Sequence, residues 1–349
     1  MSTAATSRYD AESIQVLEWP EAVRRRPGMY IGDTATAAAQ HHMLLEVLGN
    51  AVDEQLPERG ARQIRIATDG ERITVEDDGR GISPEALEHV FTRVHGGNTL
   101  KRPHVHLRPM LYGTGVAVAC ALSSVFEVEV AHGGHAYAQR FVCGRATSPV
   151  QHLGTTTRHG TRVTFTPDAS LVAQHPWDVT AIEQTCRELA ALIPGLSLIV
   201  DDTEACYARG LVDHLHYLAN DPWLIEPLHA RDERDGVGVE IAIAFARDAG
   251  ALRGFVNYCA NADGTHLRGL AAGLRRAFAG RRRWSKRLAR QLLAIVHVTL
   301  EHPRFGNPTR DWLVNPEVEH AVRELVVERL VAHFDQAPAL LDAILLAAA

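Results

Sequence analysis

The sequence predicts an α+β protein of two domains, on the basis of its length and the order of its apolar patterns. The chain has 349 residues, more than a single hydrophobic core usually organises. Runs with the alternation of strands and runs with helical periodicity occur in groups rather than in strict alternation, which is typical of α+β folds. The order of elements starts afresh near residues 206 to 212, so we expect domains over residues 1 to 208 and 209 to 349.

The first domain is predicted to hold a largely antiparallel sheet covered by helices. Helices are expected at residues 41 to 56, 84 to 95 and 178 to 192, with an Ala/Val-rich helix after residue 115. Strands are expected at residues 62 to 68, 73 to 78, 125 to 131, 135 to 142, 161 to 166 and 196 to 202. The segment "DGER" joins the first two strands as a hairpin turn, which makes them antiparallel neighbours.

The second domain is predicted to combine three long strands with helices. The strands are "VGVEIAIAFA", "LRGFVNYCA" and "LLAIVHVTL". Helices are expected at residues 266 to 279 and 316 to 333, followed by an Ala/Leu-rich final helix to Ala349.

Composition limits the possible classes of protein. The chain is 46% hydrophobic and 22% charged, with no apolar run long enough to cross a bilayer and no secretion signal at its start, so we expect a soluble cytoplasmic protein. Five cysteines without a CxxC pair argue against both a disulfide framework and a zinc site. The formal charge of -6 gives no overall attraction to nucleic acid, so any DNA contact needs a local basic patch.

The helix "MLLEVLGNAVDEQL", residues 43 to 56, carries polar groups on one face. Glu46, Asn50 and Glu54 are spaced four residues apart and therefore point to roughly the same side, while the leucines and valines between them face a core. For an isolated helix, the ordinary interpretation of such a face is simple solvation.

A second polar segment, "VEDDGRGIS", ends a strand with two carboxylates. Gly79 and Gly81 follow where the chain must bend or allow a close approach. A plain turn is the alternative interpretation of this segment.

Four segments in order resemble the nucleotide-binding motifs of the GHKL ATPases: "ExxxNxxDE" from residue 46, "DDGRGI", "YGTGVAVACALS" and "HGTRVTF". The segment "SIQVLEWPEAVRRRPGMYIGDT" is similar to the N-terminal part of gyrase B and its topoisomerase IV counterpart. The segments "DGVGVEIAIAF" and "DGTHLRGLAAGLRRAF" are similar to the transducer domain of the same type IIA topoisomerase family. The resemblance covers nearly all of the chain, and it implies a GHKL (Bergerat) ATP-binding sandwich followed by a ribosomal S5-like transducer.

The resemblance implies ATP and Mg²⁺ as cofactors and gives roles to several residues. Glu46 matches the general base that activates water, and Asn50 matches the magnesium ligand. Asp77 matches the carboxylate that accepts a hydrogen bond from the adenine amino group, and Thr161 matches a hydroxyl that holds adenine through water.

Further residues follow from the same resemblance. Tyr112, Gly113, Thr114, Gly115 and Val116 stand at the phosphate-binding loop and the helix start behind it, with Tyr112 in place of the histidine of relatives. The adenine pocket is completed by Gly79, Arg80, Gly81 and Ile82, with Glu54 beside it and Arg310 as a second catalytic residue. A packing or ion-pair role remains the alternative for Asp53 and Glu54, and a surface ion pair remains the alternative for Arg80.

The chain departs from the family pattern mainly around the position of the γ-phosphate. Pro109 and Met110 stand where relatives have glycines, and proline lacks an N–H group that could bind phosphate. Pro308 and Arg310 fall in the loop where relatives carry "QTK", so the charge is kept with a different geometry. Val142 takes the place of a family arginine, and we expect it at the edge of the adenine pocket.

The resemblance ends before the TOPRIM domain of the family, and no "EGDSA"-like acidic metal motif occurs. We therefore expect a chain that cannot cleave DNA alone. It is either a fragment or a natural short paralogue, and the alanine-rich, charge-free end favours the paralogue. The basic run "RRRWSKRLAR" offers a DNA contact, with a solvated surface as the equal alternative. The residues of this contact are Arg281, Arg282, Arg283, Lys286 and Arg287.

Two functions are compatible with these residues. The first is an ATP-binding, slowly hydrolysing module that forms a homodimer on binding nucleotide, with the arm around Tyr9 reaching the partner. The second is a catalytically impaired pseudo-ATPase that modulates a resident gyrase or topoisomerase IV by heterodimerisation. The altered lid and transducer loops favour the second function, and the intact Glu46, Asn50 and Asp77 favour the first.

Overall fold

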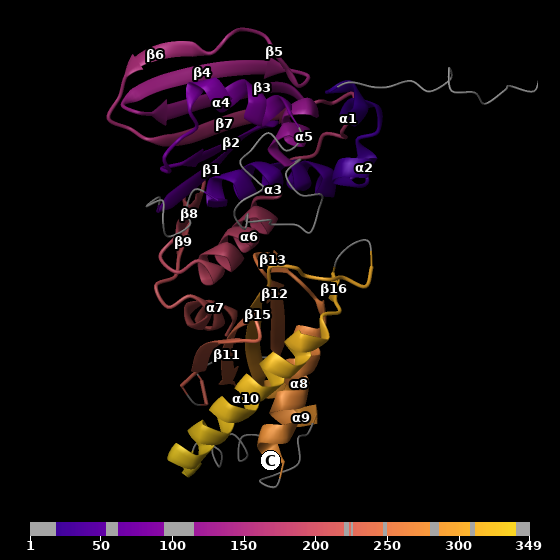
Figure 1. Ribbon diagram of the computed structural model, residues 1–349, viewed down its shortest axis with the longest axis vertical. Coiled ribbons are helices and arrows are strands. Elements are labelled where there is room, and N and C mark those ends of the chain that lie inside the picture. The colour runs from indigo at the N-terminus through magenta and orange to yellow at the C-terminus, as the bar shows by residue number, and fades with distance from the viewer. Residues whose placement is uncertain are drawn as a thin grey trace, which may run out of the picture.

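Two domains are stacked along the long axis of the molecule in the computed structural model (Figure 1). The structure describes residues 19–53, 62–93, 115–219, 223–224, 226–246, 250–279, 286–307 and 311–339, without the side chains of residues 286 and 287. The predicted boundary after residue 208 falls between β9, the last strand of the first domain, and α7, the first helix of the second. The boundary itself remains a prediction.

The first domain contains α1 to α6 and β1 to β9. Its helices are α1 (Glu21–Arg25), α2 (Gly28–Ile31), α3 (Ala37–Asp53), α4 (Pro84–Thr92), α5 (Gly115–Ala121) and α6 (Val179–Leu192). Its strands are β1 (Gln63–Asp69), β2 (Arg72–Asp77), β3 (Ser123–His132), β4 (His135–Val142), β5 (Arg145–Ala146), β6 (Gln151–Thr155), β7 (Gly160–Pro167), β8 (Ser197–Val200) and β9 (Thr203–Cys206).

Among the described residues, the strands of the first domain form one nine-stranded sheet. The strand order is β5-β4-β3-β7-β2-β1-β8-β9, with β6 paired to β4. All neighbouring strands are antiparallel except β1 and β8, so the prediction of a mostly antiparallel sheet is confirmed. The β1–β2 hairpin turns at Gly70, whose φ of 61° lies in the left-handed region that glycine tolerates.

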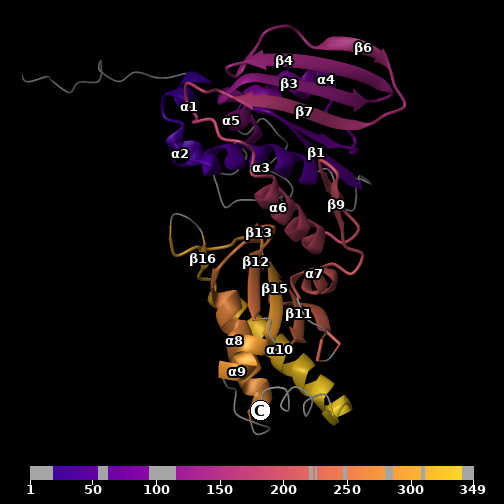
Figure 2. The ribbon, with the colours of Figure 1, turned by 180° about the vertical axis from the view of Figure 1, so that it is seen from behind.

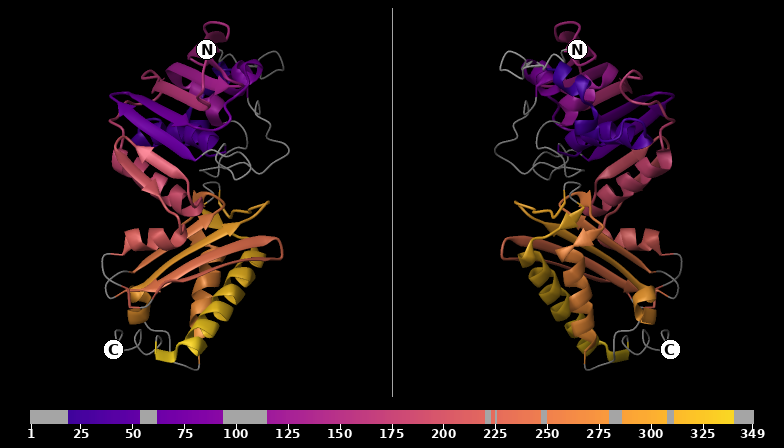
Figure 3. Two further views of the ribbon diagram at one scale, coloured as in Figure 1. Left: turned by 90° about the vertical axis from the view of Figure 1, so that its left-hand side faces the viewer. Right: turned by 90° about the vertical axis from the view of Figure 1, so that its right-hand side faces the viewer.

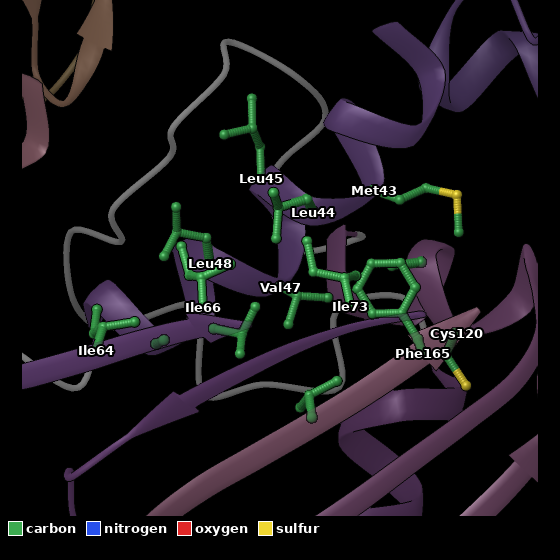
Figure 4. Close-up of a cluster of buried hydrophobic side chains, with 14 of the residues drawn as sticks. Met43, Leu44, Leu45, Val47, Leu48, Ile64, Ile66, Ile73, Cys120 and Phe165 are labelled. Carbon is green, nitrogen blue, oxygen red and sulfur yellow. The ribbon is translucent and has the colours of Figure 1, made fainter. Parts of the chain in front are cut away.

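The helix α3 lies across one face of this sheet because its apolar side packs onto the strands. Leu44, Val47 and Leu48 are at most 2% exposed, and Ile66 and Ile73 of the sheet lie beside them (Figure 4). Full burial of each such side chain contributes about 1.5–3 kcal/mol. The predicted division of the helix into an apolar and a polar face is therefore confirmed.

The second domain contains α7 to α10 and β10 to β16. Its helices are α7 (Leu211–Leu218), α8 (Thr265–Phe278), α9 (Lys286–Gln291) and α10 (Pro316–Gln336). Its strands are β10 (Leu228–Arg234), β11 (Val237–Phe245), β12 (Ala251–Val256), β13 (Cys259–Ala260), β14 (Asp263–Gly264), β15 (Leu292–Thr299) and β16 (Trp312–Leu313). In the described residues, five strands form a sheet in the order β10-β11-β15-β12-β13, and β14 pairs with β16.

The two faces of this second sheet pack against different partners. Val239, Ile241 and Ile243 belong to a buried cluster with residues of α8 and α10, which lie together on one face (Figures 1 and 3). The small residues Ala242 and Ala244 on the other face belong to a cluster with the end of α6 and with α7. We call this second group the junction cluster, because it joins both domains in one apolar interior. Its buried members are Ala191, Leu192, Leu211, Leu215, Ala242, Ala244, Ala246, Phe255, Leu293 and Ile295.

The predicted strands and helices that fall on described residues are present, except that the predicted strand "LRGFVNYCA" is divided by a turn into the antiparallel strands β12 and β13. The first helix begins at Ala37, four residues before the predicted start, and the predicted continuation past Asp53 lies outside the described residues. The end of the predicted final helix, residues 340 to 349, also lies outside them. The elements that were not predicted are the helices α1, α2, α7 and α9 and the strands β5, β6, β9, β10, β14 and β16.

Candidate functional site

The carboxylate of Glu46 is held between two neighbours on the polar face of α3. His42, one turn earlier, places its Nε2 atom 3.1 Å from Glu46 Oε1, and its side chain is only 3% exposed. An ionised carboxylate only accepts hydrogen bonds, so the His42 N–H donates to it. The contact orients the carboxylate and leaves its second oxygen to point elsewhere.

The second oxygen of Glu46 lies against the first residue of α5. A Cβ atom added to Gly115 would stand 1.9 Å from Glu46 Oε2, so only glycine fits here while the carboxylate keeps its position. The helix start that follows the predicted phosphate-binding loop therefore lies directly beside the predicted general base. Val116, the next residue, is half-buried against the core of the first domain.

Asn50 follows Glu46 by one turn of α3 and is half-buried. Residues four apart share a helix face, so its amide lies on the same side of the helix as the Glu46 carboxylate. The structure therefore places the predicted base and the predicted magnesium ligand next to each other along one face.

Asp77 ends β2 and is only 4% exposed. Its Oδ1 accepts hydrogen bonds from the backbone N–H of Gly79 at 2.8 Å and of Thr161 at 3.4 Å. These bonds come from the loop after β2 and from the start of β7, so two separate segments fix the carboxylate.

The neighbouring Asp78 forms hydrogen bonds with the start of β1 instead. Its Oδ1 accepts hydrogen bonds from the backbone N–H groups of Arg62 and Gln63, both at 2.8 Å, and its side chain is exposed. Asp78 therefore stabilises the start of β1. Of the two adjacent carboxylates, Asp77 is the one built into the interior.

Two glycines allow the backbone around Asp77 to pack closely. Gly81 has a φ of 71°, and a Cβ atom there would stand 2.5 Å from the carbonyl oxygen of Ala131. Gly160 has a φ of 112°, and its Cβ atom would stand 1.9 Å from the carbonyl oxygen of Asp77. A side chain at either position would meet backbone, which cannot rotate away.

The loop of residues 79 to 82 is also tied to β3. The Nδ1 atom of His132 lies 3.0 Å from the backbone oxygen of Arg80, so the imidazole N–H donates to it. Ile82 packs against the core of the first domain. The loop of residues 79 to 82 is thus anchored at both its backbone and its apolar side chain.

Thr161 places a buried hydroxyl next to Asp77. Its side chain is 3% exposed, and among the described residues its Oγ1 atom has no hydrogen-bond partner. A buried hydroxyl without a partner costs about 1–3 kcal/mol, so such a group in a native site indicates a ligand or water that completes it. A cavity of about 60 Å³ borders both Asp77 and Thr161, which is enough room for water.

Several predicted site residues lie outside the described residues: Glu54, Tyr112, Gly113, Thr114 and Arg310. The same holds for Tyr9, Pro109, Met110, Pro308, Arg281, Arg282 and Arg283, and for the side chains of Lys286 and Arg287.

The expectation that Val142 borders the adenine pocket is wrong. On β3, Val130 pairs with both Thr161 of β7 and Tyr137 of β4, so Tyr137 stands level with the Asp77 end of the sheet. Val142 pairs with Val125, five residues further along β4. At about 3.3 Å per residue, this places it roughly 16 Å from that level.

His42 is a site residue that the sequence analysis missed. The signal was present, because a histidine four residues before a carboxylate on a helix lies within reach of it. His266, in contrast, lies in the second domain and is fully buried, with its Nε2 atom 3.3 Å from the carbonyl oxygen of Asn261.

The fold and the site together define an ATPase domain of the histidine kinase-, DNA gyrase B- and HSP90-like class, whose family model matches residues 36–171. The DNA gyrase B family model matches residues 210–349, directly after it. The chain therefore carries these two domains in succession, and it is similar to gyrase B proteins along nearly its whole length.

Individual relatives agree with this assignment. The DNA gyrase B protein of Thermotoga maritima is 33% identical over 97% of this chain. The 43K ATPase domain of Thermus thermophilus gyrase B, solved in complex with an aminocoumarin, superimposes with a TM-score of 0.77 at 29% identity, covering 94% of this chain and 93% of that one. The gyrase B protein of Myxococcus xanthus gives a TM-score of 0.79 at 27% identity, covering 93% and 98%.

The chain spans between 52% and 59% of the length of three curated gyrase B relatives that it matches. Within the described part of the chain, no helix is long and apolar enough to cross a membrane. The same residues contain no group of three or more His, Cys, Asp or Glu side chains arranged to hold a metal ion.

Proposed function

We propose that the chain binds ATP with Mg²⁺ and hydrolyses it slowly, as the nucleotide-dependent module of a gyrase B-like assembly. The observation that carries the proposal is the Glu46 carboxylate, which His42 orients on one side and Gly115 borders on the other. A general base must be held in a fixed direction beside the reacting group, and the start of α5 is where phosphate is expected.

The Asp77 end of the site fits an adenine ring. A buried carboxylate accepts a hydrogen bond from an exocyclic amino group, and the backbone bonds from Gly79 and Thr161 keep it aligned for that contact. The Thr161 hydroxyl lacks a partner among the described residues, and a purine ring nitrogen or a bridging water would satisfy it.

The Asn50 side chain fits magnesium. Its amide oxygen is a hard donor on the same helix face as Glu46, and Mg²⁺ usually takes only one or two protein ligands together with phosphate oxygens and water. Bound Mg²⁺ supplies charge neutralisation for the phosphate groups. Glu46 then accepts the proton of the attacking water, and His42 keeps the carboxylate in position for that transfer.

The slow rate is proposed from the sequence departures around the γ-phosphate. Pro109, Met110 and Arg310 change donors that relatives place there. We further propose that the chain is cytoplasmic, dimerises on binding nucleotide, and acts with DNA or with a gyrase or topoisomerase subunit. The contact with DNA would use the basic run of Arg281, Arg282, Arg283, Lys286 and Arg287.

The same departures favour one alternative function. If the altered loops prevent turnover, the chain is a nucleotide-binding partner that modulates a resident gyrase or topoisomerase IV by heterodimerisation. In both functions Asp77 and Asn50 bind the nucleotide and its Mg²⁺. Only in the first function does Glu46 act as a general base.

Calorimetry and turnover assays on the full chain test the proposal. ATP with Mg²⁺ should bind, and Glu46→Ala should abolish turnover, whereas Glu233→Ala, at an exposed carboxylate on β10, should leave it unchanged. Sizing with a non-hydrolysable ATP analogue should show a dimer. Absence of ATP binding overturns the proposal, and binding without any turnover in the wild type supports the alternative.

A further inference from the structure

The side chain of Arg24 joins α1 to the carboxyl end of α5. Its Nη1 atom donates a hydrogen bond to the carbonyl oxygen of Ala121, the last residue of α5, at 2.9 Å. The two helices lie side by side at this point (Figures 1 and 2). Gly144 packs into the same joint, because a Cβ atom there would stand 2.7 Å from Cα of Ala121 and 2.8 Å from Cβ of Pro20. The joint between the two helices is therefore closely packed.

Asp168 holds the other nitrogen of the same guanidinium group. Nη2 of Arg24 forms an ion pair with Asp168 Oδ2, and the two side chains are only 21% and 13% exposed. Asp168 Oδ1 accepts hydrogen bonds from the backbone N–H of Ser170 at 3.0 Å and from its hydroxyl at 2.7 Å. A guanidinium group is planar and presents its donors in a fixed fork, so it cannot move toward one partner without losing the other. Arg24 therefore ties the end of α5 to the segment that follows β7.

The α5 helix extends from this joint to the Glu46 carboxylate. It has seven residues and is about 10 Å long. Its apolar side chains pack in the first-domain core, and such contacts oppose separation but have no preferred direction. The hydrogen bond at Ala121 is directional and lies at the helix end, so it fixes the position of α5 along its own axis. At the opposite end, Gly115 lies against Glu46 Oε2, and a shift of α5 along its axis would change this contact directly.

We propose that Arg24 is a positioning residue for ATP hydrolysis, which holds the carboxyl end of α5 and thereby keeps Gly115, at the other end, in its place beside Glu46. The contact with Gly115 and the contact with His42 together set the direction of the Glu46 carboxylate. The inference rests on the proposed ATP hydrolysis, since it assigns Arg24 an effect on the rate of that reaction.

The test compares Arg24→Lys with the wild-type full chain. Lysine keeps the positive charge for Asp168, so the fold is retained, but its single ammonium group cannot also reach the Ala121 carbonyl in the geometry of the arginine fork. Arg145→Lys is the matched control, because Arg145 forms an ion pair with Glu21 of the same helix α1 but is 62% exposed and joins α1 to β5. The quantities measured are the turnover per folded molecule and the NMR signal of the His42 ring without nucleotide.

Turnover in Arg24→Lys should fall roughly tenfold, less than the factor of about 100 for a full 1 Å misplacement of a catalytic group. In a Gly115→Ala background, where Glu46 is already displaced, Arg24→Lys should change the rate by less than about twofold. Arg145→Lys should leave turnover unchanged in both backgrounds. Unchanged turnover in Arg24→Lys overturns the inference, and so does a fall of the same factor in both backgrounds, because Arg24 then acts independently of the contact between Gly115 and Glu46.

The NMR measurement separates this inference from the proposed function. The His42 ring contacts the Glu46 carboxylate at 3.1 Å, so its signal reports the position of that carboxylate without any nucleotide. If the wild type neither binds nor hydrolyses ATP, the proposed function fails, and the His42 signal alone decides whether Arg24 positions Glu46. A shifted signal in Arg24→Lys, with no shift in Arg145→Lys, supports the inference, and an unchanged signal in Arg24→Lys overturns it.

Discussion

Replacement of Gly115 by alanine should slow ATP turnover while leaving the fold intact. The added methyl group would stand 1.9 Å from Glu46 Oε2 and 2.9 Å from its Cδ, whereas an ordinary contact is at least 3.4 Å. Glu46 Oε2 must therefore move about 1.5 Å away from the new methyl group. The carboxylate is the end of a flexible side chain, so it rotates away and loses its 3.1 Å contact with His42.

The size of the effect follows from this displacement. A misplacement of about 1 Å in a catalytic group can cost about 100-fold in rate, so turnover should fall by about that factor. The affinity for MgATP should change by less than roughly threefold, because alanine keeps the backbone N–H group that we propose faces phosphate. The free energy of unfolding should stay the same or rise slightly, since Gly115 begins α5 and its φ is not in the left-handed region.

Steady-state turnover, calorimetry and urea unfolding measure these three quantities. Gly28→Ala is the control, because a Cβ atom there meets nothing within 4 Å. In a Glu46→Ala background, Gly115→Ala should have no further effect on the rate, since the two residues then no longer interact. Turnover of Gly115→Ala within twofold of the wild type would refute the assigned position of Glu46.

Three further predictions concern other parts of the molecule. Asp77→Asn should weaken MgATP binding by roughly 10- to 100-fold in calorimetry, the value of one hydrogen bond to a charged group, with little loss of stability. Gly160→Ala should lower the free energy of unfolding by about 3 kcal/mol or more in urea titrations, because the methyl group meets the Asp77 carbonyl oxygen at a φ of 112°. Burial, with help from two nearby arginines, lowers the pKa of His214 to about 4, from 6.5 in the unfolded chain. Between these pH values only the unfolded chain takes up this proton, so the folded state should lose roughly 2 kcal/mol from pH 7.5 to pH 5, and His214→Gln should remove this loss.

Local patterns predicted the polar face of α3 that carries Glu46 and Asn50. The helical spacing of Glu46 and Asn50, with apolar residues between them, identifies one polar face, and the structure places both on it. The family resemblance had already distinguished Asp77 from Asp78 in "EDDG", and Asp77 continues the buried side of β2 formed by Ile73 and Val75. The hydrogen-bond partners add that Asp78 caps the start of β1.

Features that depend on long-range pairing were harder to predict. The position of Val142 was misjudged because the register of β4 against β3 and β7 is set by turns and bulges far from it. The short strands β5, β6 and β9 carry too few residues for a clear alternation. Tyr258, in the turn between β12 and β13, packs against both the first-domain core and the junction cluster, and nothing in its local sequence indicates these contacts.

The junction cluster determines what kind of motion the two domains can make. Its buried members are aliphatic or aromatic, with alanines on β11 and bulkier side chains on α7 and β15. Apolar contacts have no preferred direction, so small rotations between such surfaces keep most of the buried area and meet little resistance. Separation of the domains, in contrast, would expose the whole cluster to water. The joint therefore permits pivoting and opposes opening, and a nucleotide-driven change in this protein would be transmitted as rotation of one domain upon the other.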